Sequence, residues 1–184
     1  MRDRILPLAT VVAAVLPLLG APAASAQGPA ARAEADYPID PETAPRPVGR
    51  AFEATTPIEV DGRLDEAGWD VAEPMNNFIQ SVPDAGWPAT EQTVVRVLYD
   101  DEKLYIGALC HHSRPEDLVV KTLEWEIPGL SSHEIDVFNV YLDPFLDRRN
   151  SYTWIINPGG AYRDGQTFDD SRNLDYGWDG IVEL

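Results

Sequence analysis

Short β-branched segments, separated by turn signals, constrain the fold of this chain more than any other feature of its sequence. Residues 93–99 (TVVRVLY) are rich in Val and have the composition typical of a strand. Residues 104–109 are a second apolar run, and the polar residues Asp100–Lys103 lie between the two. This pattern predicts a β-hairpin with a four-residue loop.

Further strand signals follow along the chain. In residues 134–143 the side chains alternate, and we expect Phe138, Val140 and Leu142 to face the core with Asp136 at its rim. Residues 152–157 predict the next strand, and the turn Asn157–Gly160 leads into a strand that pairs back over 160–163. Residues 57–60 and 180–184 also have strand character.

These segments recur at a spacing of roughly ten residues, which predicts an all-β fold, an antiparallel β-sandwich of the jelly-roll or immunoglobulin-like kind. A short helical turn is expected near residues 64–71, where Leu64 and Trp69 share one side. The sequence stops inside the strand signal at 180–184, so we expect the last strand or strands of the sandwich to be missing from a longer polypeptide.

The N-terminal region predicts export. Arg2 and Arg4 precede an uncharged apolar run from Ile5 to Leu19, and Ala24-Ser25-Ala26 is a small-residue cleavage pattern. Residues 1–26 therefore resemble a signal peptide, which would place the protein in the periplasm, at the outer membrane or outside the cell. Residues 27–50 are rich in Pro and Ala and predict a disordered linker, so the folded body is expected to be 51–184.

Composition removes several classes of function. Asp and Glu number 31 against 14 Lys and Arg, giving a formal charge of −17. A surface this acidic repels phosphate backbones, so we expect no nucleic-acid partner. A single cysteine, Cys110, excludes an intrachain disulfide and a cysteine-rich metal site.

Three motifs in order resemble the family 9 carbohydrate-binding modules. The first is residues 60–69 (VDGRLDEAGW), the second is the hairpin 95–107, and the third is 136–152, which begins DVFNVYLDPF. The third motif resembles a subset of large exported bacterial proteins that carry the module at the N-terminus and an outer-membrane-type region behind it. The resemblance covers about residues 52–184.

The resemblance implies a β-sandwich that holds a terminal sugar between aromatic side chains, with calcium bound in some members. Three residues before Asp136, where such binders carry a clamp tryptophan, this sequence has His133. The second clamp aromatic of the family would lie beyond Leu184.

Aromatic residues in loops are the first candidates for a sugar site, because indole rings stack on the apolar faces of pyranoses. Trp125, between Glu124 and Glu126, and Trp87, in the loop signal PDAGWP, are expected to be exposed. Trp154 alternates within a strand and could be core or site, whereas the spacing around Trp69 predicts burial. Together with these, the candidates for contact with sugar hydroxyls are His133, Asp136, Glu124 and Glu126.

Carboxylates suggest two further kinds of site. Asp164, Asp169 and Asp170 belong to an acidic C-terminal run whose oxygen ligands suit Ca²⁺, and a solvated acidic loop is the alternative. A pair drawn from Glu124, Glu126, Glu134 and Asp136 would meet the requirement of a glycosidase, although the chain has no catalytic motif.

The sequence thus predicts noncatalytic binding of a poly- or oligosaccharide by an exported module that serves carbohydrate breakdown. Two alternatives remain. The sandwich could be a periplasmic structural domain packed on a C-terminal outer-membrane barrel, or it could be part of a glycoside hydrolase acting on O-glycosyl bonds.

Overall fold

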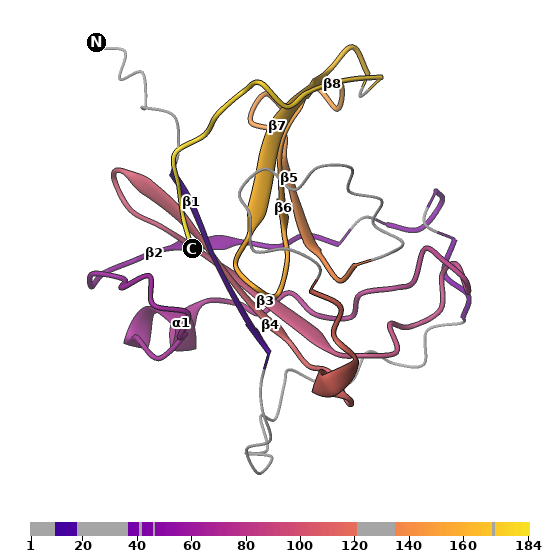
Figure 1. The fold of residues 1–184 in the computed structure, drawn as a ribbon, viewed down its shortest axis with the longest axis horizontal. Helices are drawn as coiled ribbons and strands as arrows, with labels where there is room; N and C mark the ends of the chain where they lie inside the picture. The colour runs from indigo at the N-terminus through magenta and orange to yellow at the C-terminus, as the bar shows by residue number, and fades with distance from the viewer. Residues whose placement is uncertain (1–9, 18–36, 41, 46, 121–134, 171) are drawn as a thin grey trace.

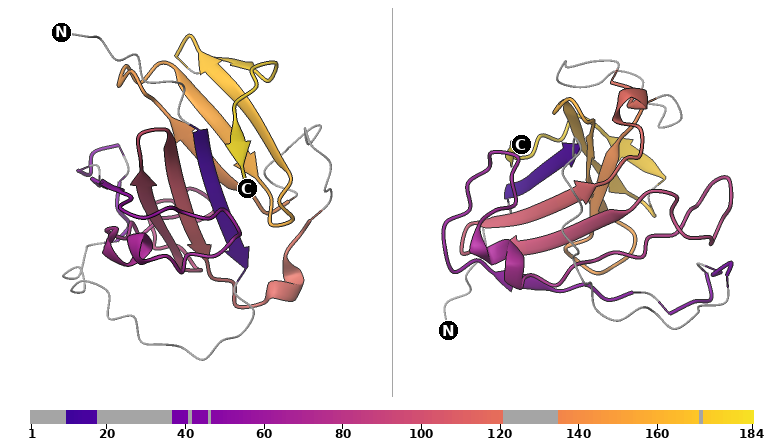
Figure 2. Two further views of the ribbon diagram at one scale, coloured as in Figure 1. Left: turned by 90° about the vertical axis from the view of Figure 1, so that its left-hand side faces the viewer. Right: turned by 90° about the horizontal axis from the view of Figure 1, so that it is seen from below.

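The chain folds as two β-sheets that face each other (Figures 1 and 2). The computed structural model describes residues 10–17, 37–40, 42–45, 47–120, 135–170 and 172–184. Helix is limited to the single turn α1 (Ala67–Val71) and the 3₁₀ turn η1 (Pro115–Asp117) within these residues. The all-β prediction is confirmed.

The first sheet has five strands in the order β2-β3-β4-β1-β9. Their bounds are β1 (Thr10–Pro17), β2 (Ala51–Glu53), β3 (Thr93–Tyr99), β4 (Lys103–Cys110) and β9 (Val182–Glu183). The predicted hairpin is its centre, since β3 and β4 pair antiparallel from Thr93 opposite Cys110 to Tyr99 opposite Leu104. Asp100 closes the turn, because its Oδ1 accepts the backbone N–H groups of Glu102 and Lys103.

The other pairings of this sheet differ from the prediction. β2 runs parallel to β3, and β1 runs parallel to both β4 and β9, so the sheet is mixed and not purely antiparallel. The strand predicted at residues 57–60 is wrong, since that segment has no regular structure and the short strand lies earlier, at β2. Which strand pairs with which depends on contacts between distant residues, and these leave little trace in a local pattern.

The second sheet is antiparallel, in the order β5-β6-β7-β8. Its strands are β5 (Phe138–Leu142), β6 (Ser151–Ile156), β7 (Tyr162–Phe168) and β8 (Asn173–Asp175). The predicted turn at Asn157–Gly160 is present. The Oδ1 atom of Asn157 accepts the N–H groups of Gly159 and Ala161, and Gly160 takes the positive φ of 84° that the turn requires.

The main core lies between the two sheets. Its buried members come from both of them: Val95, Ile106, Ala108, Trp154, Ile156 and Tyr162. The inward face of β5 also packs here, as its alternation predicted, whereas Asn139 and Tyr141 are exposed. Trp178 closes one part of this core, since its ring centroid lies 4.6 Å from that of Tyr152 and 5.8 Å from that of Trp154.

A second core covers the opposite face of the β3–β4 hairpin. Trp69 of α1, 4% exposed, packs with Leu98 and Tyr105, and a Cβ at Gly107 would lie 2.9 Å from the Trp69 ring. The carboxylate of Glu66 accepts the Trp69 Nε1–H at 3.0 Å and the Glu59 N–H at 2.7 Å. The first motif of the family resemblance therefore builds the core, and Trp69 is structural, as its spacing predicted.

Both predicted N-terminal regions, the signal peptide and the linker, contribute described residues to this fold. β1, inside the predicted signal peptide, occupies the edge of β4 over eight residue pairs. The described parts of the predicted linker, residues 37–40, 42–45 and 47–50, contain no helix or strand, but they are tied to the body. The N–H of Ile39 donates to the carbonyl of Gly86 at 2.9 Å. The signal peptide itself stays a prediction.

Candidate functional site

A hairpin-like loop, residues 78–89, carries the exposed indole of Trp87. The N–H of Ala89 donates to the Phe78 carbonyl and the N–H of Gln80 donates to the Trp87 carbonyl, both in the manner of a short antiparallel ladder. Trp87 is 48% exposed at the end of this ladder. The ladder fixes the backbone on both sides of the indole, so the ring is presented by an ordered support.

Tyr37 lies beside Trp87 and makes a second aromatic surface. The two ring centroids are 6.3 Å apart, the planes are 18° from parallel, and Tyr37 is 38% exposed. We call these two residues the aromatic pair. Because the Ile39–Gly86 hydrogen bond joins the segments that carry the two rings, the pair is held by backbone as well as by ring contact.

Gly86 permits this arrangement. Its φ is 82°, which residues with a Cβ rarely adopt, and a Cβ there would lie 2.1 Å from the carbonyl oxygen of Ile39. Any larger residue would push residues 37–40 away from the hairpin. The PDAGWP turn is the sequence signal for Trp87, whereas Tyr37, which lies beside it, belongs to the segment 27–50 that the composition predicts to be a linker.

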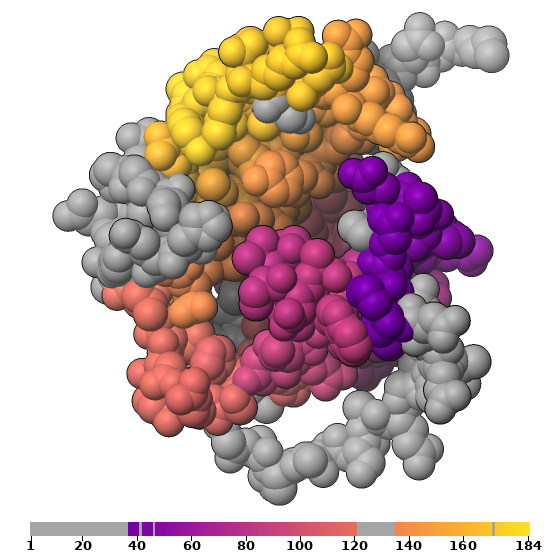
Figure 3. All heavy atoms as spheres, turned by 90° about the vertical axis from the view of Figure 1, so that its right-hand side faces the viewer, coloured from indigo at the N-terminus to yellow at the C-terminus, as the bar shows by residue number. Residues whose placement is uncertain are grey.

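A cleft of about 870 Å³ opens between the two sheets, next to the same loop. Its walls are the hairpin β3–β4, the edge strand β5 and the segments 47–49 and 73–79. Figure 3 looks onto this side, where a recess separates the orange atoms from the magenta and purple ones. The volume falls in the range of small-molecule sites, about 300–1,000 Å³.

The lining of the cleft is mostly apolar. Most of its residues are valine, isoleucine, leucine, methionine, phenylalanine or proline. Asn76, Asn77 and Asn139 are also among the lining residues, and Asn77 has a positive φ of 61°. Asn139 belongs to the outward face of β5. Glu73 is the one lining side chain that is charged at neutral pH among the described residues. The cleft could not be predicted from the sequence, because no local motif encodes a gap between two sheets.

The remaining sugar-site candidates divide into three groups. Trp125, Glu124, Glu126 and His133 lie outside the described residues. Trp154 is 2% exposed within the main core, so the structure makes it a packing residue and not a sugar contact. Asp136 is half-buried, and its carboxylate accepts the N–H of Val119 at 2.7 Å, a bond that ties β5 to the segment after η1.

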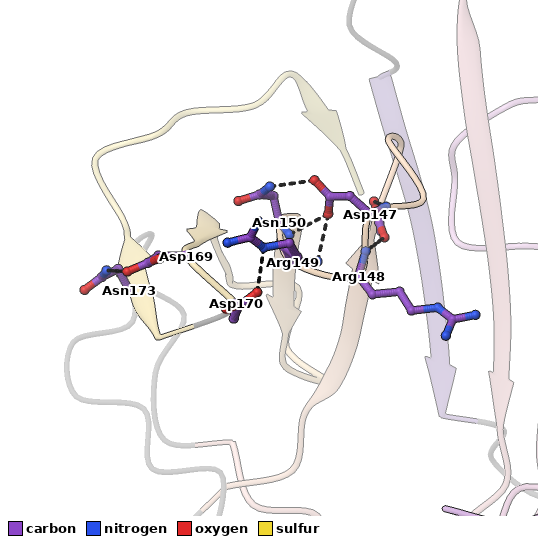
Figure 4. Close-up of polar contacts among 8 residues, drawn as sticks. Asp147, Arg148, Arg149, Asn150, Asp169, Asp170 and Asn173 are labelled. Atoms are coloured by element: carbon purple, nitrogen blue, oxygen red, sulfur yellow. Dashed lines mark hydrogen bonds and ion pairs between the residues drawn. The ribbon is translucent and has the colours of Figure 1, made fainter.

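The three aspartates proposed for calcium are not brought together. Asp164 is buried within β7 and accepts the N–H of Gly180 at 2.6 Å. Asp169 and Asp170 lie in the turn after β7, where Asp170 pairs with Arg149 Nε at 2.7 Å and Asp169 contacts Asn173 (Figure 4). The described part of the chain contains no group of three or more His, Cys, Asp or Glu side chains that could hold a metal. The calcium hypothesis stays a prediction with no support from these positions.

The loop between β5 and β6 uses its acidic residues to fix the backbone. Asp143 accepts the N–H groups of Phe145, Asp147 and Arg148. Asp147 accepts those of Arg149 and Asn150, and these bonds to the charged form hold the pKa of the Asp147 carboxyl below its ordinary value (Figure 4). The third motif of the family resemblance therefore encodes loop geometry here.

One clearly shifted titratable group, Tyr105, belongs to the second core beside the β3–β4 hairpin and is not among the residues that line the cleft. Burial, reinforced by a 2.6 Å hydrogen bond to the carboxylate of Asp100, raises the pKa of Tyr105 to about 12. The same bond lowers the pKa of Asp100. Burial also raises the pKa of the thiol of Cys110, a half-buried residue that packs against the main core. These shifts belong to the core and the hairpin turn.

No protein-family model, curated protein or solved structure matches this chain. Within the described residues, no helix has the length and apolar character needed to span a membrane.

Proposed function

We propose that this chain is a noncatalytic carbohydrate-binding module, and that the aromatic pair of Tyr37 and Trp87 contacts the sugar. The two rings are exposed, nearly parallel and held by an ordered support, and the outer face of each offers an apolar surface on which the C–H face of a pyranose stacks. Asp84 lies in the same loop as Trp87, and its exposed carboxylate can accept hydrogen bonds from sugar hydroxyls. The resemblance to family 9 modules points to the same class of ligand.

The exposed aromatic pair is the observation that carries this proposal. Isolated apolar residues are common on protein surfaces, but this pair combines two rings from segments distant in sequence with a backbone hydrogen bond that joins their supports. The ligand would be a poly- or oligosaccharide, and export of the module would bring it to such substrates in carbohydrate breakdown.

Titration with xylo- and cello-oligosaccharides, followed by calorimetry, tests the proposal. We expect Trp87→Ala and Tyr37→Ala each to weaken binding at least about tenfold, which corresponds to about 1.4 kcal/mol. Tyr99→Ala is the matched control, because Tyr99 is also an exposed aromatic and lies on β3 away from the pair. Absence of heat with the wild-type chain at millimolar sugar, or equal affinity of all three variants, would reject the proposal.

A structural role in a larger outer-membrane protein is the second candidate. Phe145 and Leu146, 68% and 87% exposed, project from the loop that Asp143 and Asp147 hold rigid. A fixed apolar tip of this kind suits packing against another domain. If this is the role, a Phe145→Ser/Leu146→Ser double variant reduces recovery of the protein in outer-membrane fractions while leaving sugar binding unchanged.

Glycoside hydrolysis stays a prediction. Glu124, Glu126 and Glu134 lie outside the described residues, and the carboxylate of Asp136 is engaged with the backbone of Val119. Turnover of a chromogenic glycoside that is lost in Glu124→Gln or Glu134→Gln would establish it.

A further inference from the structure

The cleft between the two sheets is lined by apolar side chains, which a polar sugar ring does not need for binding. Val97 and Leu104 from the first sheet and Val140 from the second are only partly buried, although they belong to the main core. All three line the cleft. Apolar side chains that meet in a preformed hollow gain free energy when an apolar group displaces the water between them.

The charge of the lining restricts what can enter. Glu73 is its single charged side chain at neutral pH, and no Lys, Arg or His belongs to the lining among the described residues. The chain as a whole carries −17. A carboxylate or phosphate placed here would meet negative charge and no cation, and the mostly apolar lining makes it costly to strip water from a charged group of either sign. The fitting ligand group is therefore uncharged.

The cleft and the aromatic pair are linked by one short ladder. Phe78 lines the cleft and its carbonyl accepts the N–H of Ala89. Trp87 stands two residues from Ala89, which is about 7 Å along an extended strand. A ligand that is longer than this distance of about 7 Å by about one sugar ring can contact both the cleft and the aromatic pair.

We propose that the cleft receives an uncharged apolar substituent, an alkyl, acyl or aryl group, carried by a glycan whose sugar lies on the aromatic pair. The proposal rests on the proposed carbohydrate-binding function and adds the substrate class: a glycan with an apolar decoration. The amides of Asn76 and Asn77, which are among the lining residues, then meet the polar linkage between the sugar and its substituent.

Four probes separate the sugar from the apolar group: methyl β-glucoside, hexyl β-glucoside, 1-hexanol and hexanoate, each below its aggregation concentration. Binding is measured by calorimetry and by NMR shifts of the methyl groups of Val97 and Leu104. Each methylene that leaves water raises the association constant about fourfold, so three buried methylenes give roughly a sixtyfold preference for the hexyl over the methyl glucoside. We expect 1-hexanol to shift the same methyl groups and hexanoate to shift them far less.

Val140→Phe fills part of the cleft from the edge strand β5, and Ile181→Phe is the matched control at an exposed position outside the lining. We expect Val140→Phe to remove the preference for the hexyl chain and to leave the affinity for methyl glucoside unchanged, while Ile181→Phe alters neither. Circular dichroism and thermal unfolding check that both variants fold. The methyl shifts in the wild-type chain give the answer on their own if Val140→Phe does not fold.

The results separate the two proposals. Binding of methyl glucoside without any chain-length preference, or hexyl binding that leaves the Val97 and Leu104 methyl groups unshifted, overturns the cleft proposal and keeps the sugar site. Shifts with 1-hexanol and hexyl glucoside, together with no methyl glucoside binding, keep the apolar site and overturn its link to the sugar. Absence of binding by every probe overturns the cleft proposal, as does tighter binding of hexanoate than of 1-hexanol.

Discussion

Replacing Gly86 by alanine tests how the aromatic pair is assembled. Gly86 and Gly62 have almost the same φ, 82° and 81°, but their surroundings differ. A Cβ at Gly62 meets nothing within 4 Å, whereas a Cβ at Gly86 lies 2.1 Å from the Ile39 oxygen and 3.0 Å from the Ile39 nitrogen. Gly62→Ala is therefore a control that has the conformational strain without the clash.

The expected magnitude follows from the contacts that are lost. Both variants pay the cost of a left-handed alanine, about 1–2 kcal/mol, and both restrict the unfolded chain equally, so these effects cancel in the comparison. Backbone atoms cannot swing aside as a flexible side chain does, so residues 37–40 must move. The Ile39–Gly86 hydrogen bond contributes about 1 kcal/mol and the Tyr37–Trp87 contact about as much. We expect Gly86→Ala to lose about 2 kcal/mol more than Gly62→Ala.

Urea unfolding measures this difference, and amide hydrogen exchange of Ile39 reports the local event. Ile39 should exchange quickly in Gly86→Ala and stay protected in Gly62→Ala. Sugar binding should weaken in the first variant alone, because Tyr37 leaves Trp87. Equal losses of stability in the two variants, with the Ile39 amide protected in both, would refute the inference that the absence of a Cβ at Gly86 allows residues 37–40 to pack against the loop 78–89.

Three further predictions concern the rest of the fold. Trp69→Ala should lower the free energy of unfolding by about 3–5 kcal/mol, measured by urea unfolding, because a large side chain leaves the second core. Folding raises the pKa of Tyr105 to about 12, so the contribution of this group to the free energy of unfolding is fully present below pH ~10 and is lost as the pH rises toward 12. Asp100→Asn should lower the pKa of Tyr105 but leave it above the ordinary value, because burial remains. An unchanged titration of the phenolate absorbance would contradict this. A chain that begins at Gln27 lacks β1, so the backbone amides of β4 should exchange faster than in the full chain. The exposed edge of β4 should also increase self-association, measured by sedimentation. Equal protection of the β4 amides in both chains would show that β1 does not cover this edge.

Much of the fold could be predicted from local pattern. Local sequence predicts the β3–β4 hairpin, the inward face of β5 and the turn at Asn157, because alternation and turn chemistry act between near neighbours. The site was harder to predict. Trp87 could be placed on a loop from PDAGWP, but the exposure of Trp154 depended on whether another layer covers β6, which its alternation leaves open.

Side-chain periodicity and backbone preferences therefore make the all-β class, the β3–β4 hairpin and the turn at Asn157 predictable from local sequence. Four features emerge only when the chain has folded: the parallel neighbours of β3 and β4, the burial of Trp154, the docking of Tyr37 beside Trp87 and the cleft between the sheets. The physical reason is the range of the interactions. A strand or a turn is specified within about ten residues, whereas the aromatic pair joins residues 37 and 87, and the cleft exists only where two separately formed sheets fail to fill the space between them.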